Sequence, residues 1–416
     1  MKKPVRSPDD QKIIVLGGGI QQERCIKRCQ KLGYYVVCFD KSETCIGARV
    51  ADRFFAVSID DFDEVLLRVS ELVNVVAIMA PASEIGNSTA SKIAAKQGYI
   101  YNSPTVVEMT RNKSEMRKRM TSIGLKNPNY VIVSSEHLSN DVLPKKESKI
   151  LFPCIVKPVD SSAGRGISIC YSTVDLRCSV EYALKESSQG LVIIESLLDG
   201  IQFSIETLSY SGQHKVVAIA AQTMDPTEMQ VEIGHILPAP ISKGLNSSIT
   251  EYALKLLNGF GIQTGACHIE VRIIENEIYT LDFASRMGGW RDLMIECALG
   301  EGYIDAFIKS HIPGEKLDPS FIYENNNICP PEFCVARMAF TSNDQLLLDD
   351  LMKSGSCEFQ WVDKFYLKKI QGSPKLSLSN SAGHFLYKSN IEREKIFVSK
   401  FDCPNLLEDL NCLPST

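Results

Sequence analysis

Long apolar runs are missing from this 416-residue sequence, since no stretch approaches the roughly 18 to 20 consecutive apolar residues that a membrane-spanning helix requires. Residues 1–10 contain no apolar signal core. A basic stripe is missing too: the net charge is -5 and the Lys and Arg residues are scattered, so nothing would neutralise the phosphates of a nucleic acid. These absences predict a cytoplasmic protein that contacts neither a membrane nor nucleic acid.

Cysteines at metal-binding or paired spacing are also missing. The sequence has 14 cysteines, but most stand singly in apolar runs, as Cys38 and Cys154 do, and no CxxC occurs. The nearest pair, Cys25 and Cys29, lies four residues apart on a predicted helix. This pattern predicts thiols in a reducing compartment and no disulfide framework.

The N-terminal part alternates apolar strands with helical patterns. A βαβ alternation with short glycine joints predicts a doubly wound parallel α/β domain over residues 1–112. Asp40 lies about 20 residues beyond the glycine turn, as in a dinucleotide site, but Gln22 stands where GxGxxG has its third glycine. A dinucleotide site and a turn without a ligand both remain open. The expected elements are strands 12–16, 34–40 and 75–80 and helices 20–32 and 83–97.

From residue 113 the pattern becomes α+β. We expect one subdomain over residues 113–190, a second over residues 191–314, and a small C-terminal unit over residues 332–416, joined by a Pro- and Asn-rich link. A 416-residue chain is too long for one compact core, which agrees with this division. The expected strands are 151–157, 167–171, 191–195, 203–208, 215–221, 267–274 and 277–283, with a helix at 247–258.

A lysine and a glycine-rich loop stand together at residues 156–169, VKPVDSSAGRGISI. A predicted strand delivers Lys157, and the small residues of loop 160–166 allow backbone amides to approach an anion closely. The loop lacks GK[ST] and no helix follows, so it is not a Walker A loop. Lys113 and Lys157 together could neutralise nucleotide phosphates.

Two carboxylates lie on a predicted hairpin, CHIEVRIIENEIYTLDF. Glu270 and Asp282 flank a turn at Glu275-Asn276 and, counted from that turn, stand at roughly matching levels. Both positions have even numbers, which we take to place both side chains on one face. Two hard oxygen donors on one sheet face are typical of a Mg²⁺ that bridges nucleotide phosphates. Arg286 follows directly and could clamp a phosphoryl group.

Taken together, residues 11–313 resemble the ATP-grasp superfamily, and in particular its carboxylate–amine ligase branch, which includes amino-acid and dipeptide-type enzymes. VLGGGIQQE resembles the pre-ATP-grasp domain, NKSEMRKRM the first ATP-lysine motif, and IIESLLDGIQFSIE the hinge that holds adenine. HIEV and LDFASRMGG are similar to the metal and phosphate-binding motifs, and SAGHFLYKSN to a strand of the C-terminal lid.

The resemblance implies a role for each matching residue. Glu195 would accept a hydrogen bond from the adenine amine, and Gln202 would stand at the position of the ribose-binding carboxylate. Ala284 stands where an Asn commonly completes the metal set. The implied sets are, for ATP, Lys113, Lys157, Asp160, Ser161, Ser162, Gly164, Arg165, Gly166, Glu195, Ser196, Leu197, Leu198 and Gln202; for metal, Glu270 and Asp282; for catalysis, Arg286, Lys157 and His268; and for substrate, Glu232, His268, Arg286 and Gly289.

The implied activity is an ADP-forming ligase that makes an acyl-phosphate from a carboxylate, with an amino acid as the favoured carboxylate, and passes it to an amine. ATP and Mg²⁺, with Mn²⁺ as a substitute, are the implied cofactors, and small molecules are the substrates. Relatives on this scaffold are often dimers, so a homodimer is one of the oligomeric states that stay open. Three alternatives stay open: a bicarbonate-dependent ATP-grasp carboxylase, a nucleotide-binding member with reduced or no catalysis, and a dinucleotide oxidoreductase.

Overall fold

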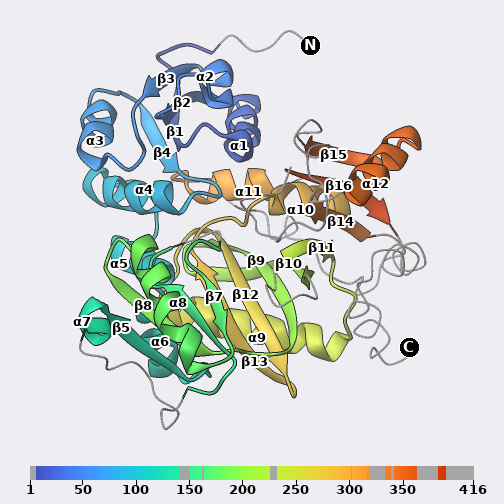
Figure 1. The fold of residues 1–416 in the computed structure, drawn as a ribbon. Helices are drawn as coiled ribbons and strands as arrows, with labels where there is room; N and C mark the ends of the chain where they lie inside the picture. Colours follow the sequence, from blue (N-terminus) through green and yellow to red (C-terminus); the bar gives the residue numbers. More distant parts are fainter. Residues whose placement is uncertain are drawn as a thin grey trace.

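The computed structural model describes residues 6–139, 150–161, 164–224, 232–300, 302–315, 317, 333–338, 342–362 and 383–389. These residues form three β-sheets with helices packed against them (Figure 1). The predicted ligand residue Ser162 lies outside the described residues. The fold class, a parallel α/β domain followed by α+β units, is confirmed.

The N-terminal sheet is parallel, with strand order β3-β2-β1-β4. Strand β1 and all but the end residues of β2 are buried because helices cover both faces, which explains their apolar sequence. The third strand in chain order, residues 53–56, was not predicted, since RFFA is short and partly exposed. The elements are β1 (Lys12–Leu16), α1 (Ile20–Lys31), β2 (Tyr35–Asp40), α2 (Ile46–Val50), β3 (Arg53–Ala56), α3 (Phe62–Ser70), β4 (Val75–Met79) and α4 (Glu84–Gln97).

The second sheet is small and antiparallel, with order β5-β8-β6-β7. Strand β6 (Cys154–Pro158) carries Lys157, and β7 (Ser168–Cys170) returns beside it after the glycine-rich loop. Helix α8 (Thr173–Glu186) packs against this sheet. The remaining elements of this part are α5 (Pro104–Arg111), α6 (Lys113–Ser122), β5 (Tyr130–Ser134), α7 (Ser135–Ser139) and β8 (Leu191–Ser196).

The third sheet has eight antiparallel strands in the order β13-β12-β9-β10-β11-β14-β16-β15. Among the described C-terminal strands, β14 pairs with β11, β16 pairs with β14, and β15 pairs with β16, so these strands extend the sheet. Helix α9 (Lys243–Phe260) covers one face of the sheet with an apolar stripe. The other elements are β9 (Ile201–Tyr210), β10 (Gln213–Met224), β11 (Glu232–Leu237), β12 (Gly265–Ile274), β13 (Glu277–Ala284), α10 (Arg291–Leu299), α11 (Tyr303–Ser310), β14 (Phe333–Met338), α12 (Ser342–Lys353), β15 (Cys357–Val362) and β16 (Gly383–Ser389).

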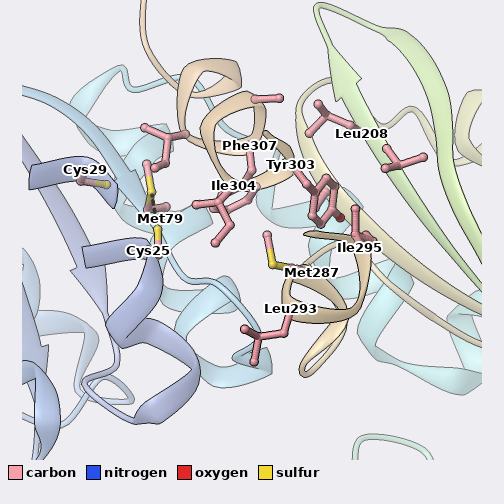
Figure 2. Packing of buried hydrophobic residues seen from close by; sticks show 14 of the residues in the cluster. Cys25, Cys29, Met79, Leu208, Met287, Leu293, Ile295, Tyr303, Ile304 and Phe307 are labelled. Carbon is pink, nitrogen blue, oxygen red and sulfur yellow. Dashed lines mark hydrogen bonds between the residues drawn. The ribbon is translucent and has the colours of Figure 1, made fainter. Parts of the chain in front are cut away.

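A shared core joins the N-terminal sheet to the large sheet. Helices α10 and α11 lie between the two sheets, and Met79, Leu293 and Ile304 pack into one buried cluster there (Figures 1 and 2). Arg24 on α1 reaches Asp292 on α10, with 2.7 Å between Nε and Oδ2. These contacts fix the N-terminal sheet against the strands that carry the candidate site. Within the described residues, none of the helices is long and apolar enough to cross a membrane.

Candidate nucleotide and metal site

The hairpin of β12 and β13 brings Glu270 and Asp282 opposite each other, as predicted, but the predicted reason was wrong. Glu275 and Asn276 have φ values of 49° and 67°, so the two strands are joined by a two-residue turn of left-handed residues. A regular ladder from this turn pairs Val271 with Thr280 and would place positions of equal parity on opposite faces. A β-bulge at residue 281 shifts the register by one residue, and Glu270 then pairs with Asp282.

Lys113 joins this carboxylate pair to the glycine-rich loop. It is the first residue of α6, where the side chain of Asn112 caps the helix. The Nζ of Lys113 lies 3.6 Å from Oδ1 of Asp282 and donates to the carbonyl of Ser161 at 3.1 Å. Its backbone amide donates to the carbonyl of Val159, two residues beyond Lys157. Both lysines therefore stand beside the same loop.

Lys157 is held by a buried ion triad. Its Nζ lies 3.0 Å from Oε2 of Glu195, and Nε of Arg117 donates to Oε1 of the same carboxylate at 2.6 Å. Burial by itself would raise the pKa of Glu195, but Arg117 and Lys157 lower it to about 2. Both oxygens of Glu195 are thus engaged by cations. The geometry favours a role for this side chain in orienting Lys157, while its predicted contact with adenine stays a prediction.

The glycine-rich loop is anchored at its start and constrained at its end. The carboxylate of Asp160 accepts hydrogen bonds from Ser187, Ser188 and the amide of Gln189, which hold its pKa below the usual value despite burial. Because these contacts use both of its oxygens, we assign Asp160 to anchoring the loop and not to binding phosphate. Gly166 has φ 75°, and a Cβ there would lie 2.6 Å from a ring carbon of Pro158. The roles of Ser161, Gly164 and Arg165 toward phosphate stay predictions.

The hinge after β8 is ordered by backbone hydrogen bonds and by one arginine. The amides of Ser196 and Leu197 donate to the carbonyls of Asn129 and Pro153. Arg272 on β12 donates to the carbonyl of Leu198 and, at 3.0 Å, to Oε1 of Gln202. Gln202 is therefore tied to the hinge it was predicted to complete, and the predicted contacts of Ser196, Leu197, Leu198 and Gln202 with nucleotide stay predictions.

His268 connects Glu270 to a buried carboxylate on the neighbouring strand. Nδ1 of His268 contacts Oε1 of Glu206, which is fully buried on β9, and Nε2 lies 3.3 Å from Oε1 of Glu270. Burial would lower the pKa of His268, but the two carboxylates raise it to about 9. A charged imidazolium between them in turn lowers the pKa of Glu270 against the effect of burial. The geometry favours a role for His268 in orienting Glu270, and its predicted roles in catalysis and substrate binding stay predictions.

A second polar cluster continues from Glu270 along the sheet. Nε2 of Gln222 donates to Glu232 at 3.0 Å and lies 3.4 Å from Oε1 of Glu270. Nε2 of His235 lies 2.5 Å from Oε1 of Glu232 and 2.6 Å from Nη2 of Arg291. Burial raises the pKa of Glu232, although Arg291 opposes the rise. The structure thus brings Glu232, a predicted substrate residue, to the metal carboxylates.

Arg286 and Gly289 face the N-terminal domain. Nη2 of Arg286 lies 2.7 Å from Oε1 of Glu84 at the start of α4, and the described contacts of Arg286 do not include the metal carboxylates. A Cβ on Gly289 would lie 3.2 Å from Oε1 of Gln21 at the start of α1. The predicted role of Arg286 toward phosphate stays a prediction, and both residues border the junction between the two sheets.

Three residues of the site were missed in the sequence. Arg117, Glu206 and Gln222 are all buried and all contact a predicted site residue. Each left a weak signal. Arg117 stands one helical turn after Lys113, Glu206 is the only charged residue of β9, and Gln222 directly follows the apolar run 216–221 of β10.

The glycine turn after β1 has its amides occupied by the protein itself. A Cβ on Gly18 would lie 2.5 Å from Sγ of Cys45, so α2 is packed closely over the turn. A pyrophosphate at a Rossmann turn needs free amides there. Asp40, which would bind the ribose of a dinucleotide, already accepts a hydrogen bond from the amide of Gly18. The dinucleotide alternative is therefore not favoured. The amides of Gly17, Gly18 and Gly19 donate to the carbonyl of Phe39, Oδ2 of Asp40 and Oε1 of Gln22.

The carboxylate pair fits a magnesium ion that is also bound by nucleotide. Among the described residues, no group of three or more His, Cys, Asp or Glu side chains could form a metal cage. Mg²⁺ is commonly held by one or two carboxylates together with phosphate oxygens and water. Glu270 and Asp282 supply two carboxylates on neighbouring strands, and Ala284, where the resemblance expects a third ligand, is buried opposite His268.

Comparison with known proteins agrees with the predicted resemblance and with the fold. Residues 150–293 match the family model described as an ATP-grasp domain. The chain is 25% identical over 291 residues to a formate-dependent phosphoribosylglycinamide formyltransferase of Wolinella succinogenes, covering 67% of this chain and 71% of the relative. A namesake from Hydrogenovibrio crunogenus is 25% identical over 288 residues, covering 66% and 69%.

Two solved structures share the fold over nearly the whole chain. An L-amino acid ligase from Bacillus licheniformis superposes with a TM-score of 0.75 at 18% identity, covering 94% of this chain and 97% of the ligase. An N5-carboxyaminoimidazole synthetase from Staphylococcus aureus in complex with ADP gives 0.71 at 18% identity, covering 96% and 99%.

Residues 150–293 are therefore matched as an ATP-grasp domain, and the chain shares its fold with the two solved enzymes. The resemblance to ATP-grasp ligases that the sequence predicted is confirmed, and the relatives that the chain resembles are enzymes.

Proposed function

We propose that this chain joins a small carboxylate to an amine, using ATP to form an acyl-phosphate and releasing ADP and phosphate. The observation that carries the proposal is the convergence of Lys113, Lys157, Glu270 and Asp282 around one loop. Its relatives named as formate-dependent formyltransferases, and a neighbour named as an L-amino acid ligase, support the carboxylate and the amine as substrate classes.

Lys113 and Lys157 would each neutralise part of the negative charge on the phosphates of the nucleotide. Lys157 extends from a rigid strand and is oriented by Glu195, whereas Lys113 reaches across to the metal side. Glu270 and Asp282 would hold Mg²⁺, which supplies neutralisation of the phosphate charge when bound. Catalysis of phosphoryl transfer depends mainly on such positioning and electrostatic stabilisation. The glycine-rich loop would exclude water from the activated carboxylate.

Glu232 is the residue best placed to assist the amine. An attacking amine must be neutral and must lose a proton as the amide forms. Glu232 lies beside Glu270 through Gln222, and burial raises its pKa toward the range useful for accepting a proton. Arg286, beside α4 at the sheet junction, is placed to bind the anionic end of a substrate there.

The test is an ADP-release assay over three sets of substrates: pairs of amino acids, formate with a panel of amines, and bicarbonate with the same amines, with products identified by mass spectrometry. We expect ADP release that requires both a carboxylate and an amine. ADP release with bicarbonate and no other carboxylate would favour the carboxylase alternative. Nucleotide binding without turnover in any set would favour the non-catalytic one.

Matched variants tie the activity to the site. Lys157→Met removes the proposed phosphate-binding cation and Glu270→Gln removes the charge of a proposed Mg²⁺ ligand, so we expect turnover to fall by about 100-fold or more in each. The controls are Lys126→Met and Glu277→Gln, which separate an exposed ion pair at the tip of the same hairpin and should leave turnover unchanged. Equal turnover in Lys157→Met and Lys126→Met would reject the site.

A further inference from the structure

Arg117 is a fully buried arginine outside the set of residues expected to touch ATP or metal. A buried guanidinium is costly unless its donors are paired, because its charge has left water. Nε of Arg117 donates to Glu195 at 2.6 Å, Nη1 to the carbonyl of Thr280 at 2.7 Å, and Nη2 to the carbonyl of Leu281 at 3.2 Å. One planar group thus connects helix α6 to strands of two different sheets.

We call the hydrogen bond from Arg117 to Glu195 the nucleotide arm of the guanidinium, because Glu195 also binds Lys157. Glu195 is shared between Arg117 and Lys157, so the carboxylate divides its attraction between two cations. Without Arg117, the full charge of Glu195 would fall on Lys157. Lys157 would then be bound more tightly to the protein and would be less able to turn toward a phosphate.

The second arm consists of the hydrogen bonds from Arg117 to the carbonyls of Thr280 and Leu281, which lie next to the proposed metal ligand Asp282. Leu281 is the extra residue of the β-bulge that sets Asp282 opposite Glu270. A bulged residue leaves backbone groups outside the regular ladder, and Arg117 binds the carbonyls of residue 281 and of the residue before it. The guanidinium therefore holds the bulge from the buried side and fixes the register of Asp282.

We infer that Arg117 is a positioning residue that couples the nucleotide lysine to the metal-binding carboxylates. The inference rests on the proposed function only in assigning those two roles to Lys157 and to Glu270 with Asp282. Helix α6 supports the coupling, since Lys113 at its first turn contacts Asp282 and Arg117 follows one turn later. Arg117 itself need not touch substrate.

The test measures equilibrium binding of the non-hydrolysable analogue AMP-PNP across a series of Mg²⁺ concentrations, by calorimetry, with no turnover required. Arg117→Met removes both arms, so we expect AMP-PNP affinity at saturating Mg²⁺ to fall roughly tenfold, and the Mg²⁺ concentration for half-maximal binding to rise by a similar factor. Arg117→Lys keeps a charge for Glu195 but cannot bind both carbonyls as a fork. It should restore most of the affinity and leave the Mg²⁺ requirement raised.

Two further variants separate positioning from general destabilisation. Glu195→Gln removes the charge that orients Lys157 but leaves the two carbonyl contacts of Arg117, so it should weaken AMP-PNP binding without raising the Mg²⁺ requirement, besides lowering stability. Leu256→Ala removes a fully buried side chain of α9 beneath the same large sheet and should lower the melting temperature alone.

The outcomes are decisive in both directions. A raised Mg²⁺ requirement in Arg117→Lys but not in Leu256→Ala supports the inference, and a wild-type requirement in Arg117→Lys overturns it, including when Arg117→Met fails to fold. AMP-PNP binding by wild type with the expected variant pattern, but no turnover with any substrate, would retain the inference and reject the proposed ligase. Wild type that binds no AMP-PNP would overturn both.

Discussion

Glu195→Gln gives a measurable test of the buried triad through its effect on stability. The substitution keeps the shape of the side chain and removes its charge, which leaves Arg117 and Lys157 as two buried cations without a counter-ion. The pKa of Glu195 is about 2 in the folded chain against an ordinary 4.5. At about 1.4 kcal/mol for each pH unit, this difference corresponds to about 3 kcal/mol of stability.

The sign of the pH dependence follows from the lowered pKa. A carboxyl group whose pKa falls on folding stabilises the protein fully above its unfolded pKa, and that contribution disappears as the pH falls through the folded pKa. The stability difference between wild type and Glu195→Gln should therefore be complete at pH 7 and pH 5.5. It should shrink between pH 4.5 and about 2, where the wild-type carboxyl becomes neutral as well.

The assay is urea unfolding of wild type and Glu195→Gln at pH 7, 5.5 and 3.5. Glu277→Gln, which breaks the exposed pair with Lys126, is the matched control and should unfold as wild type does. A difference below about 1 kcal/mol at pH 7 would contradict a compensated buried triad. A difference that stays constant from pH 5.5 to 3.5 would show that charge is not its cause.

Two other substitutions test the loop and a buried histidine. Gly166→Ala should destabilise the chain in urea unfolding by more than the roughly 1 kcal/mol that left-handed backbone costs a non-glycine residue, because its Cβ would meet Pro158. It should also weaken AMP-PNP binding. The control Gly190→Ala, with φ 65° and open space around it, should show the backbone cost only. His311 has its pKa lowered to about 4 by burial, so wild type loses stability as the pH falls from 6.5. Between pH 7 and 5, the unfolding free energy of His311→Gln should fall by about 2 kcal/mol less than that of wild type. An equal fall in both proteins would refute a neutral buried imidazole.

Local sequence patterns determined the elements and several of the site positions. The strands at 12–16 and 75–79 could be predicted because parallel strands covered on both faces are continuously apolar. Lys157 could be singled out because it stands in a short motif beside small residues, and Lys113 because NKSEMRKRM resembles the first ATP-lysine motif; neither depends on distant parts of the chain.

The pairing of these positions was decided by the tertiary structure. Glu270 and Asp282 share a face only because of the bulge at residue 281, and strand alternation carries no signal for such an insertion. In the sequence, Arg117 is one of several basic residues on a helix. In the fold it is buried and contacts Glu195 and two carbonyls of β13. Spacing along the chain fixes which groups are available. Contacts between residues distant in the sequence, such as Arg117 with Thr280 or His268 with Glu206, arise only when strands and helices pack, and they set the charge and orientation of the site.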